Sequence, residues 1–107
     1  VFLSDIPALF TNREIPLDAA LVQLSPPDRH GYCSLGTSVD AARAAVDTAP
    51  LVIAEINRQM PRTHGHAAIP FARLTSYVET DRPLPEHPAE AENAVEGRIG
   101  ELVAGLI

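Results

Sequence analysis

The sequence predicts an α/β fold with a mostly parallel open sheet and flanking helices. Two short apolar runs, Ala19–Leu24 and Leu51–Ile56, have the length and continuity of strands that are buried in a parallel sheet. Between them, residues 39–49 place their apolar side chains on one face of a helix. A strand, a helix and a second strand of these lengths indicate a right-handed crossover between parallel neighbours.

The N-terminal residues predict the end of one strand and a short helix. Val1-Phe2-Leu3 is apolar, and we expect it to be the last part of a strand. Ser4 to Pro7 then begins a helix that runs to Phe10, with Pro7 early in the helix, where its missing N–H is tolerated. Residues 12–18 connect this helix to the first apolar run.

The segment between the two apolar runs contains clear stop and start signals. Ser25-Pro26-Pro27-Asp28 ends the first strand, and residues 32–35 form a short extended piece between two glycines. Thr37 and Asp40 have the spacing of a capping box, which predicts the start of the helix, and Pro50 ends it.

The C-terminal part predicts weak strands, a loop and a last helix. Residues 69–81 carry weaker extended signals, and Arg82–Pro88 contains three prolines and is predicted to be a loop. A helix is expected from Ala89. Three glycines inside this helix each cost about 1 kcal/mol relative to Ala, so it depends on packing. Its apolar stripe consists of Val95, Ile99, Leu102, Val103 and Leu106.

Composition restricts the class of protein. The 107 residues suffice for one domain with one modest core. The net charge is −6, every cationic side chain is Arg and no basic cluster is present, so we expect no nucleic-acid surface and no binding to anionic lipid. The apolar runs are far too short to cross a membrane. A single Cys suits a reducing compartment, and we expect a cytoplasmic protein.

Both ends of the chain look like the middle of regular structure. The chain begins with Val1-Phe2-Leu3 and stops at Leu106-Ile107 without a polar tail. We therefore expect residues 1–107 to form a single α/β segment of an incomplete domain, with the remainder of the same polypeptide as its partner.

Two proline-stiffened loops follow the predicted strands, Ser25–Gly31 and Asn57–Gly65. Because ligands of open parallel sheets bind beyond the carboxyl ends of the strands, these loops are candidates for a binding site. Arg62 is the first candidate residue, since a guanidinium on a rigid loop can clamp a carboxylate or phosphate with two hydrogen bonds. The alternative is an internal ion pair with Asp28 or Glu55.

Other titratable groups permit further hypotheses. Glu55 interrupts an apolar strand and could be a nucleophile or base with a raised pKa, or a paired carboxylate at the strand end. His64 and His66 could hold a metal ion together with His30 or Cys33, but two ligands at this spacing are a weak signal, and we expect no metal site. Cys33 and His30 could form a nucleophile pair, although a lone Cys is more often a small core residue.

Two long strings of the sequence carry a family resemblance. DAALVQLSPPDRHGYCSLG (Asp18–Gly36) and VIAEINRQMPRTHG (Val52–Gly65) resemble the acetyl-CoA hydrolase/transferase family. This group of family I CoA-transferases includes acetate:succinyl-CoA and 4-hydroxybutyrate CoA-transferases. The resemblance covers nearly the whole chain and corresponds to the latter part of the family's N-terminal half, which implies a CoA-transferase-like sheet.

The resemblance implies an enzyme that, at full length, transfers coenzyme A between an acyl-CoA and a carboxylic acid or hydrolyses acetyl-CoA. In this family a glutamate forms acyl anhydride and glutamyl-CoA thioester intermediates, which is covalent catalysis by a carboxylate. That glutamate belongs to the C-terminal half, so we expect no catalytic residue here and an inactive isolated chain.

Coenzyme A is the implied co-substrate, acyl-CoA and small carboxylates are the implied partners, and a homodimer is the implied assembly. The residues expected to border the acyl-CoA cleft are Ser25, Asp28, Asn57, Met60, Pro61, Arg62, Thr63, His64 and Gly65.

Two other functions stay open at this point. The chain could be a non-enzymatic α/β ligand-binding or interaction module that shares only the sheet, or a small metal-dependent hydrolase that uses His64 and His66. A catalytic glutamate motif downstream would distinguish the enzyme from the module, and metal analysis would test the hydrolase.

Overall fold

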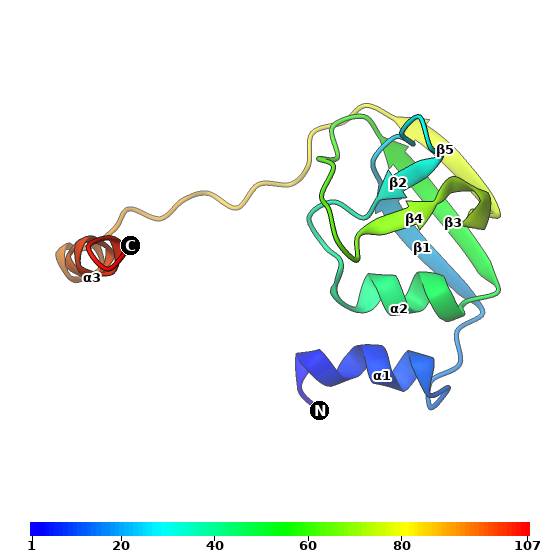
Figure 1. Cartoon of the computed structure of the whole chain (residues 1–107), viewed down its shortest axis with the longest axis horizontal. Helices are drawn as coiled ribbons and strands as arrows, with labels where there is room; N and C mark the ends of the chain where they lie inside the picture. The colour runs from blue at the N-terminus through cyan, green and yellow to red at the C-terminus, as the bar shows by residue number, and fades with distance from the viewer.

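The fold is built on a three-stranded parallel sheet in the order β1-β3-β5 (Figure 1). The computed structural model describes all residues, Val1–Ile107. β1 (Ala19–Leu24) and β3 (Leu51–Asn57) pair in parallel from Ala19↔Leu51 to Leu24↔Ile56, and β3 pairs in parallel with β5 (Ser76–Thr80). The predicted α/β fold with its parallel strand neighbours is confirmed.

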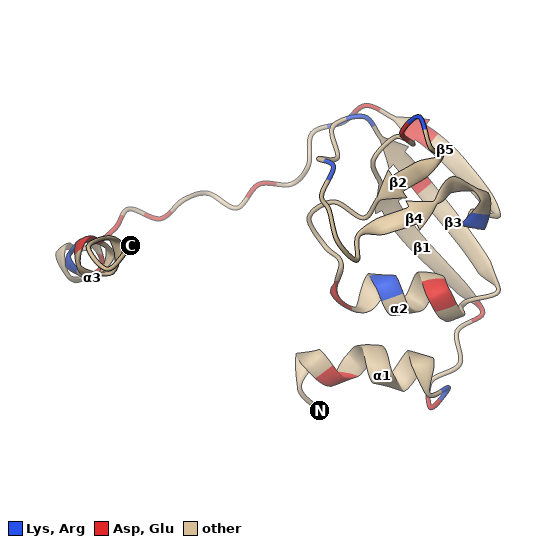
Figure 2. Ribbon diagram, viewed as in Figure 1, with Lys and Arg blue, Asp and Glu red and all other residues tan.

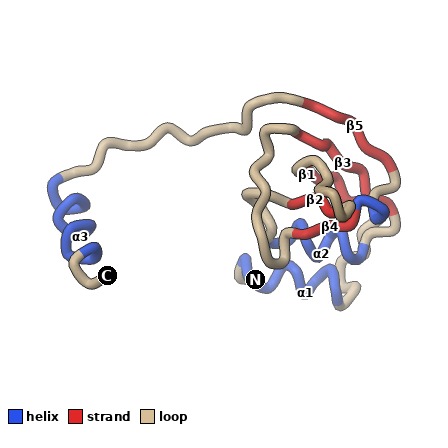
Figure 3. The backbone as a smooth tube through the Cα atoms, turned by 45° about the horizontal axis from the view of Figure 1, so that its top comes forward, coloured by secondary structure: helices blue, strands red, loops and turns tan.

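One face of this sheet is covered by two layers of structure. α2 (Asp40–Thr48) packs beside β1, and α1 (Ile6–Thr11) packs on α2 (Figures 1 and 3). β2 (Tyr32–Ser34) and β4 (Ala68–Pro70) form an antiparallel pair that adds Cys33 and Ile69 to the same core. The core therefore contains small and branched side chains, as the low aromatic content requires: Ala20, Leu24, Cys33, Leu35, Val46, Ala49, Val52, Ala54, Ile56, Ala67 and Ile69.

The opposite face of the sheet is open. Leu21 on β1 is 80% exposed and Val78 on β5 is 62% exposed, and Ile53 lies between them on β3. Alternate residues of these strands point to the two faces, so the covered face is formed by the residues on either side of Leu21 and Ile53. Apolar side chains are thus present on both faces of β1 and β3, which explains their continuous apolar runs.

The start of the chain differs from the prediction. Val1-Phe2-Leu3 does not form a strand: Leu3–Asp5 is a 3-10 helix that leads directly into α1. The predicted helix start at Ser4–Pro7 is otherwise confirmed, with Pro7 in the first turn of α1.

The predicted capping box of α2 is wrong. Val39 occupies the N-cap position and no side chain caps the helix, so Thr37 does not serve this role. Thr37 lies on the turn that follows Gly36, two residues before the N-cap position, so its hydroxyl is placed too early in the chain to cap the helix.

The last helix begins five residues later than expected. α3 spans Ala94–Ala104, and Asn93 is its N-cap: the Asn93 side-chain oxygen accepts from the amides of Val95 at 2.9 Å and Glu96 at 3.0 Å. The Glu96 carboxylate accepts in return from the Asn93 amide at 2.9 Å, so the two residues form a capping box. A local signal therefore sets this boundary, and the Glu residues before Asn93 remain outside the helix.

α3 lies apart from the α/β body at the end of an extended connector, which confirms the predicted loop Arg82–Pro88 (Figures 1 and 3). None of its residues is buried. The Cα radius of gyration of 17.6 Å accordingly exceeds the value of about 13 Å for a compact chain of this length.

Arg and acidic residues are scattered along the chain without a run of basic residues (Figure 2). None of the helices combines the length and the apolar character that a membrane span requires.

Candidate functional site

The two predicted loops begin side by side at the carboxyl edge of the sheet (Figure 1). Leu24 ends β1 and pairs with Ile56, one residue before the end of β3, so the residues that follow the two strands leave the sheet at the same edge. Their predicted proximity is confirmed. This edge is the usual ligand-binding edge of an open parallel sheet.

The first loop is folded around the carboxylate of Asp28. One Asp28 oxygen accepts from the His30 amide at 2.8 Å and from the Tyr32 amide at 3.0 Å. Gly31 completes the turn with a φ of 81°. The amide of Tyr32, followed by that of His30 and the charge of Arg62, lowers the pKa of Asp28, so this carboxylate is ionised and fixed within the loop.

Arg62 ties the second loop to the first. Its Nη2 donates to the carbonyl oxygen of Pro26 at 2.6 Å, and both Nη atoms lie 3.2 Å from the carbonyl oxygen of Tyr32. Its Nη1 lies 3.6 Å from Asp28. The predicted ion pair of Arg62 with Asp28 is confirmed, and the alternative pair with Glu55 is wrong. The guanidinium group also donates hydrogen bonds to two carbonyl groups.

The second loop has an interior and an exterior part. Asn57 is fully buried: its Nδ2 donates to the carbonyl of Arg82 at 2.9 Å, and its Oδ1 accepts from the amides of Gln59 and Arg82. Met60 is also buried, whereas Pro61, His64 and Gly65 are exposed. The exposed residues form the outer border of this edge, while Asn57 fixes the loop from within.

The remaining predicted residues, Ser25 and Thr63, point inward. Ser25 is 2% exposed and its hydroxyl accepts from the amide of Ser34 at 2.9 Å. The Thr63 hydroxyl donates to the carbonyl of Gly36 at 2.9 Å and lies 3.1 Å from the hydroxyl of Ser34. Sequence reasoning missed Ser34, although a small hydroxyl residue between apolar neighbours just before a glycine was a usable signal.

Glu55 has a different partner from those expected. Its carboxylate accepts from Arg82 at 2.5 Å and 2.6 Å and from the Thr80 hydroxyl at 2.7 Å. The hydrogen bonds from Arg82 and then Thr80 lower the pKa of Glu55 to about 2. A nucleophile or base with a raised pKa is therefore the wrong description of this residue.

The histidine and cysteine hypotheses receive no support from the geometry. Nowhere in the chain do three or more His, Cys, Asp or Glu side chains gather in a way that could hold a metal ion. His64 and His66 are both exposed, and the His30 ring accepts from Arg29 at 3.0 Å. Cys33 is fully buried, and burial raises the pKa of its thiol, which disfavours the reactive thiolate.

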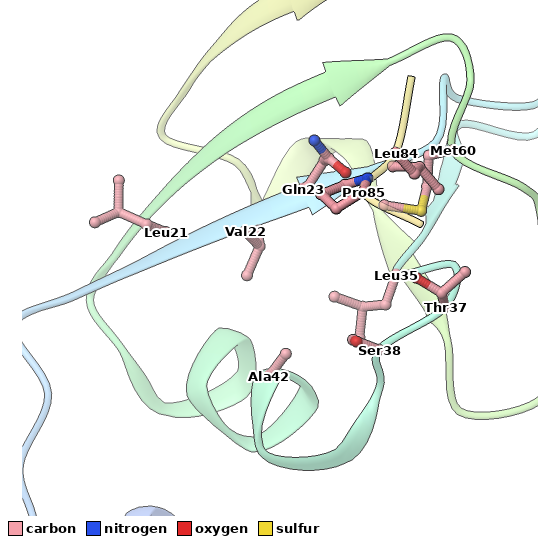
Figure 4. Close-up of a pocket in the computed structure, with 10 residues that line it drawn as sticks. All are labelled: Leu21, Val22, Gln23, Leu35, Thr37, Ser38, Ala42, Met60, Leu84 and Pro85. Atoms are coloured by element: carbon pink, nitrogen blue, oxygen red, sulfur yellow. The ribbon is translucent and has the colours of Figure 1, made fainter. Parts of the chain in front are cut away.

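A largely apolar cavity of about 410 Å³ lies between β1, the start of α2, the second loop and the connector (Figure 4). Met60 brings the second loop to this cavity, and Leu84 and Pro85 bring the connector. The complete lining is Leu21, Val22, Gln23, Leu35, Thr37, Ser38, Ala42, Met60, Leu84 and Pro85.

Comparison with known proteins gives a consistent family. Residues 1–86 match the family described as acetyl-CoA hydrolase/transferase N-terminal domain. The chain is 43% identical over 104 residues to a succinyl-CoA:acetate/propanoyl-CoA:succinate CoA transferase of Fasciola hepatica, covering 97% of this chain and 22% of the relative. It is also 43% identical over 106 residues to the 4-hydroxybutyrate coenzyme A transferase of Clostridium kluyveri, covering 99% and 25%.

Solved structures show the same relation. The 4-hydroxybutyrate CoA-transferase of Porphyromonas gingivalis superimposes with a TM-score of 0.83 at 41% identity, over 98% of this chain and 27% of that one. RipA from Yersinia pestis superimposes with a TM-score of 0.86 at 34% identity, over 99% and 25%. The chain thus spans about a quarter of the length of the relatives that it matches.

Proposed function

Because this chain belongs to the acetyl-CoA hydrolase/transferase family, we propose that it forms part of an enzyme that transfers coenzyme A between an acyl-CoA and a carboxylic acid or hydrolyses acetyl-CoA. Its role is to supply sheet scaffold and one border of the acyl-CoA cleft. Coenzyme A is the co-substrate, and small carboxylates are the acceptors.

The observation that carries this proposal is the joined pair of loops at the carboxyl edge of β1 and β3. Two proline-containing loops leave adjacent parallel strands and are joined by hydrogen bonds from Arg62. These bonds fix the shape of this edge in the absence of ligand. Met60 extends this edge into an apolar cavity. A preformed concave border of this kind suits the binding of an acyl-CoA.

We place the reacting carboxylate outside residues 1–107. The family resemblance implies a glutamate nucleophile, which needs a carboxylate free to attack a thioester. Glu55 is occupied by Arg82 and Thr80, and Asp28 by the backbone of its own loop. The border residues Pro61, His64 and Gly65 would act in binding, together with the remainder of the polypeptide. We further propose that the full-length protein is a cytoplasmic homodimer.

The test is to assay CoA transfer by the 107-residue chain and by the protein that carries it at the full length of the family. Each is incubated with succinyl-CoA and acetate, and acetyl-CoA formation is followed by chromatography, with acetyl-CoA hydrolysis measured in parallel. We expect turnover by the full-length protein and none by the chain alone.

Turnover by the purified 107-residue chain would contradict the external nucleophile and return attention to Glu55 and Cys33. A full-length protein that binds acyl-CoA without either reaction would instead favour the non-enzymatic binding module.

A further inference from the structure

Ser34 is a buried side chain with an unusually complete set of hydrogen bonds. It is 1% exposed, and its hydroxyl oxygen accepts from the amides of Thr63 and Gly36, both at 3.0 Å. The same hydroxyl lies 3.2 Å from the Thr63 carbonyl and 3.1 Å from the Thr63 hydroxyl, so its single proton is also used. A serine hydroxyl offers one donor and two acceptor positions, and all three are occupied.

The backbone of Ser34 makes the corresponding contact with the first loop. Its amide donates to the Ser25 hydroxyl at 2.9 Å, and its carbonyl accepts from the Ser25 amide at 2.9 Å. Ser34 therefore lies between the end of β1 and the second loop and is bonded to both. These bonds join residues 9 and 29 positions away in the sequence.

Gly36 packs against the second loop. A Cβ atom at Gly36 would come within 2.1 Å of Met60 Sδ, so the backbone here approaches Met60 more closely than any side chain would allow. The Gly36 carbonyl also accepts from the Thr63 hydroxyl. The loop is thus held at two points, at Met60 by contact and at Thr63 by hydrogen bonds.

We propose that Ser34 is a positioning residue, whose hydroxyl holds the Asn57–Gly65 loop in the shape that the acyl-CoA cleft requires. It acts through its hydrogen bonds to Thr63 and Gly36 and does not itself touch the substrate. This inference rests on the proposed function, because it assigns a role within the same border of the cleft. Removing the hydroxyl leaves the buried amide of Gly36 and the partly buried amide of Thr63 without their acceptor, and the loop moves to find new partners.

The test compares Ser34→Ala with Val46→Ala in the full-length protein. Val46 is fully buried in α2, so its truncation lowers stability without touching the loop. Both variants are assayed well below their unfolding temperatures. Because small displacements of positioning groups have large kinetic effects, we expect kcat/KM of Ser34→Ala to fall at least about threefold below that of Val46→Ala.

Amide hydrogen exchange provides a readout that does not depend on activity. In Ser34→Ala, and not in Val46→Ala, we expect exchange at the amides of Thr63 and Gly36 to accelerate at least about tenfold. A smaller kinetic difference overturns the inference, and so does a kinetic loss without faster exchange, since the effect would not pass through the loop.

If the full-length protein has no CoA-transfer or hydrolase activity, the proposed function fails and exchange alone decides the anchoring role of Ser34. Unchanged exchange at the two amides would then overturn it.

Discussion

Glu55 shows how a single residue on the open sheet face is stabilised. Its carboxylate lies where Leu21, Ile53 and Val78 leave the sheet apolar, and it is held by Arg82 and Thr80. Because the Arg82 side chain is 58% exposed, solvent screens this ion pair, and we expect its contribution to stability to be modest.

Glu55→Gln tests the pH dependence of this contact. The pKa of Glu55 is lowered from 4.5 to about 2, so the folded chain binds fewer protons than the unfolded chain in this range. The stabilising contribution is therefore complete above about pH 4.5 and is lost as the pH falls towards about 2. We expect the wild-type chain to be more stable than Glu55→Gln at neutral pH, and the difference to vanish at low pH.

Urea unfolding midpoints at a series of pH values measure this difference. Glu79→Gln is the matched control, because it removes one negative charge from the exposed part of β5, and Glu79 forms no ion pair. A wild-type advantage that persisted unchanged through the acid range would contradict the role of the Glu55–Arg82 pair.

At the level of elements, the turn between β2 and α2 connects the sheet edge to the covering helix. Gly36 occupies this turn with a φ of 68° and lies against Met60. Gly31, in the first loop, has a similar φ of 81° but open space where a Cβ would be. Substitution of Gly31 therefore measures the free-energy cost of the backbone conformation alone, whereas substitution of Gly36 adds the cost of packing against Met60.

Gly31→Ala and Gly36→Ala should differ in stability. Both place Ala in the left-handed region, which costs about 1–2 kcal/mol. Gly36→Ala must also displace Met60, and we expect a further loss of about 1–3 kcal/mol in the free energy of unfolding from overpacking. Denaturant titrations of the two variants measure the difference directly. Equal losses would show that Met60 adjusts without cost.

At the level of the whole molecule, two apolar surfaces are uncovered. One is the open face of the sheet, and the other is the stripe on α3, where Ile99, Leu102 and Val103 are each more than half exposed. Apolar surfaces of this kind are normally covered in a folded assembly. This fits a chain that spans about a quarter of its relatives' length.

We expect the isolated 107-residue chain to be marginally stable or to self-associate. Sedimentation velocity at increasing concentration measures this, and Leu102→Glu on α3 should reduce the association because α3 has no buried residues to disturb. Leu21→Glu, which places a charge on the open sheet face, shows whether that face contributes. A monomer with a sharp unfolding transition at high temperature would contradict the expectation.

Local signals in the sequence predicted most of the scaffold. The continuous apolar runs of β1 and β3 and the helix between them are sufficient for a parallel crossover, because apolar side chains on both strand faces and helical periodicity are visible within a few residues. The positions of both loops follow from the same pattern. The start of α3 was also determined locally, by the capping box of Asn93 and Glu96, even though the prediction placed it earlier.

The pairing of side chains was decided by the tertiary structure. Arg82 reaches Glu55 across 27 residues because β5 lies beside β3, and Arg62 reaches Pro26 across 36 residues because the two loops share an edge. Ser34 acquires its partners in the same way, from a loop 29 residues away. Periodicity shows which face a residue occupies, whereas the identity of its hydrogen-bond partner depends on strand order and on the path of each loop through space.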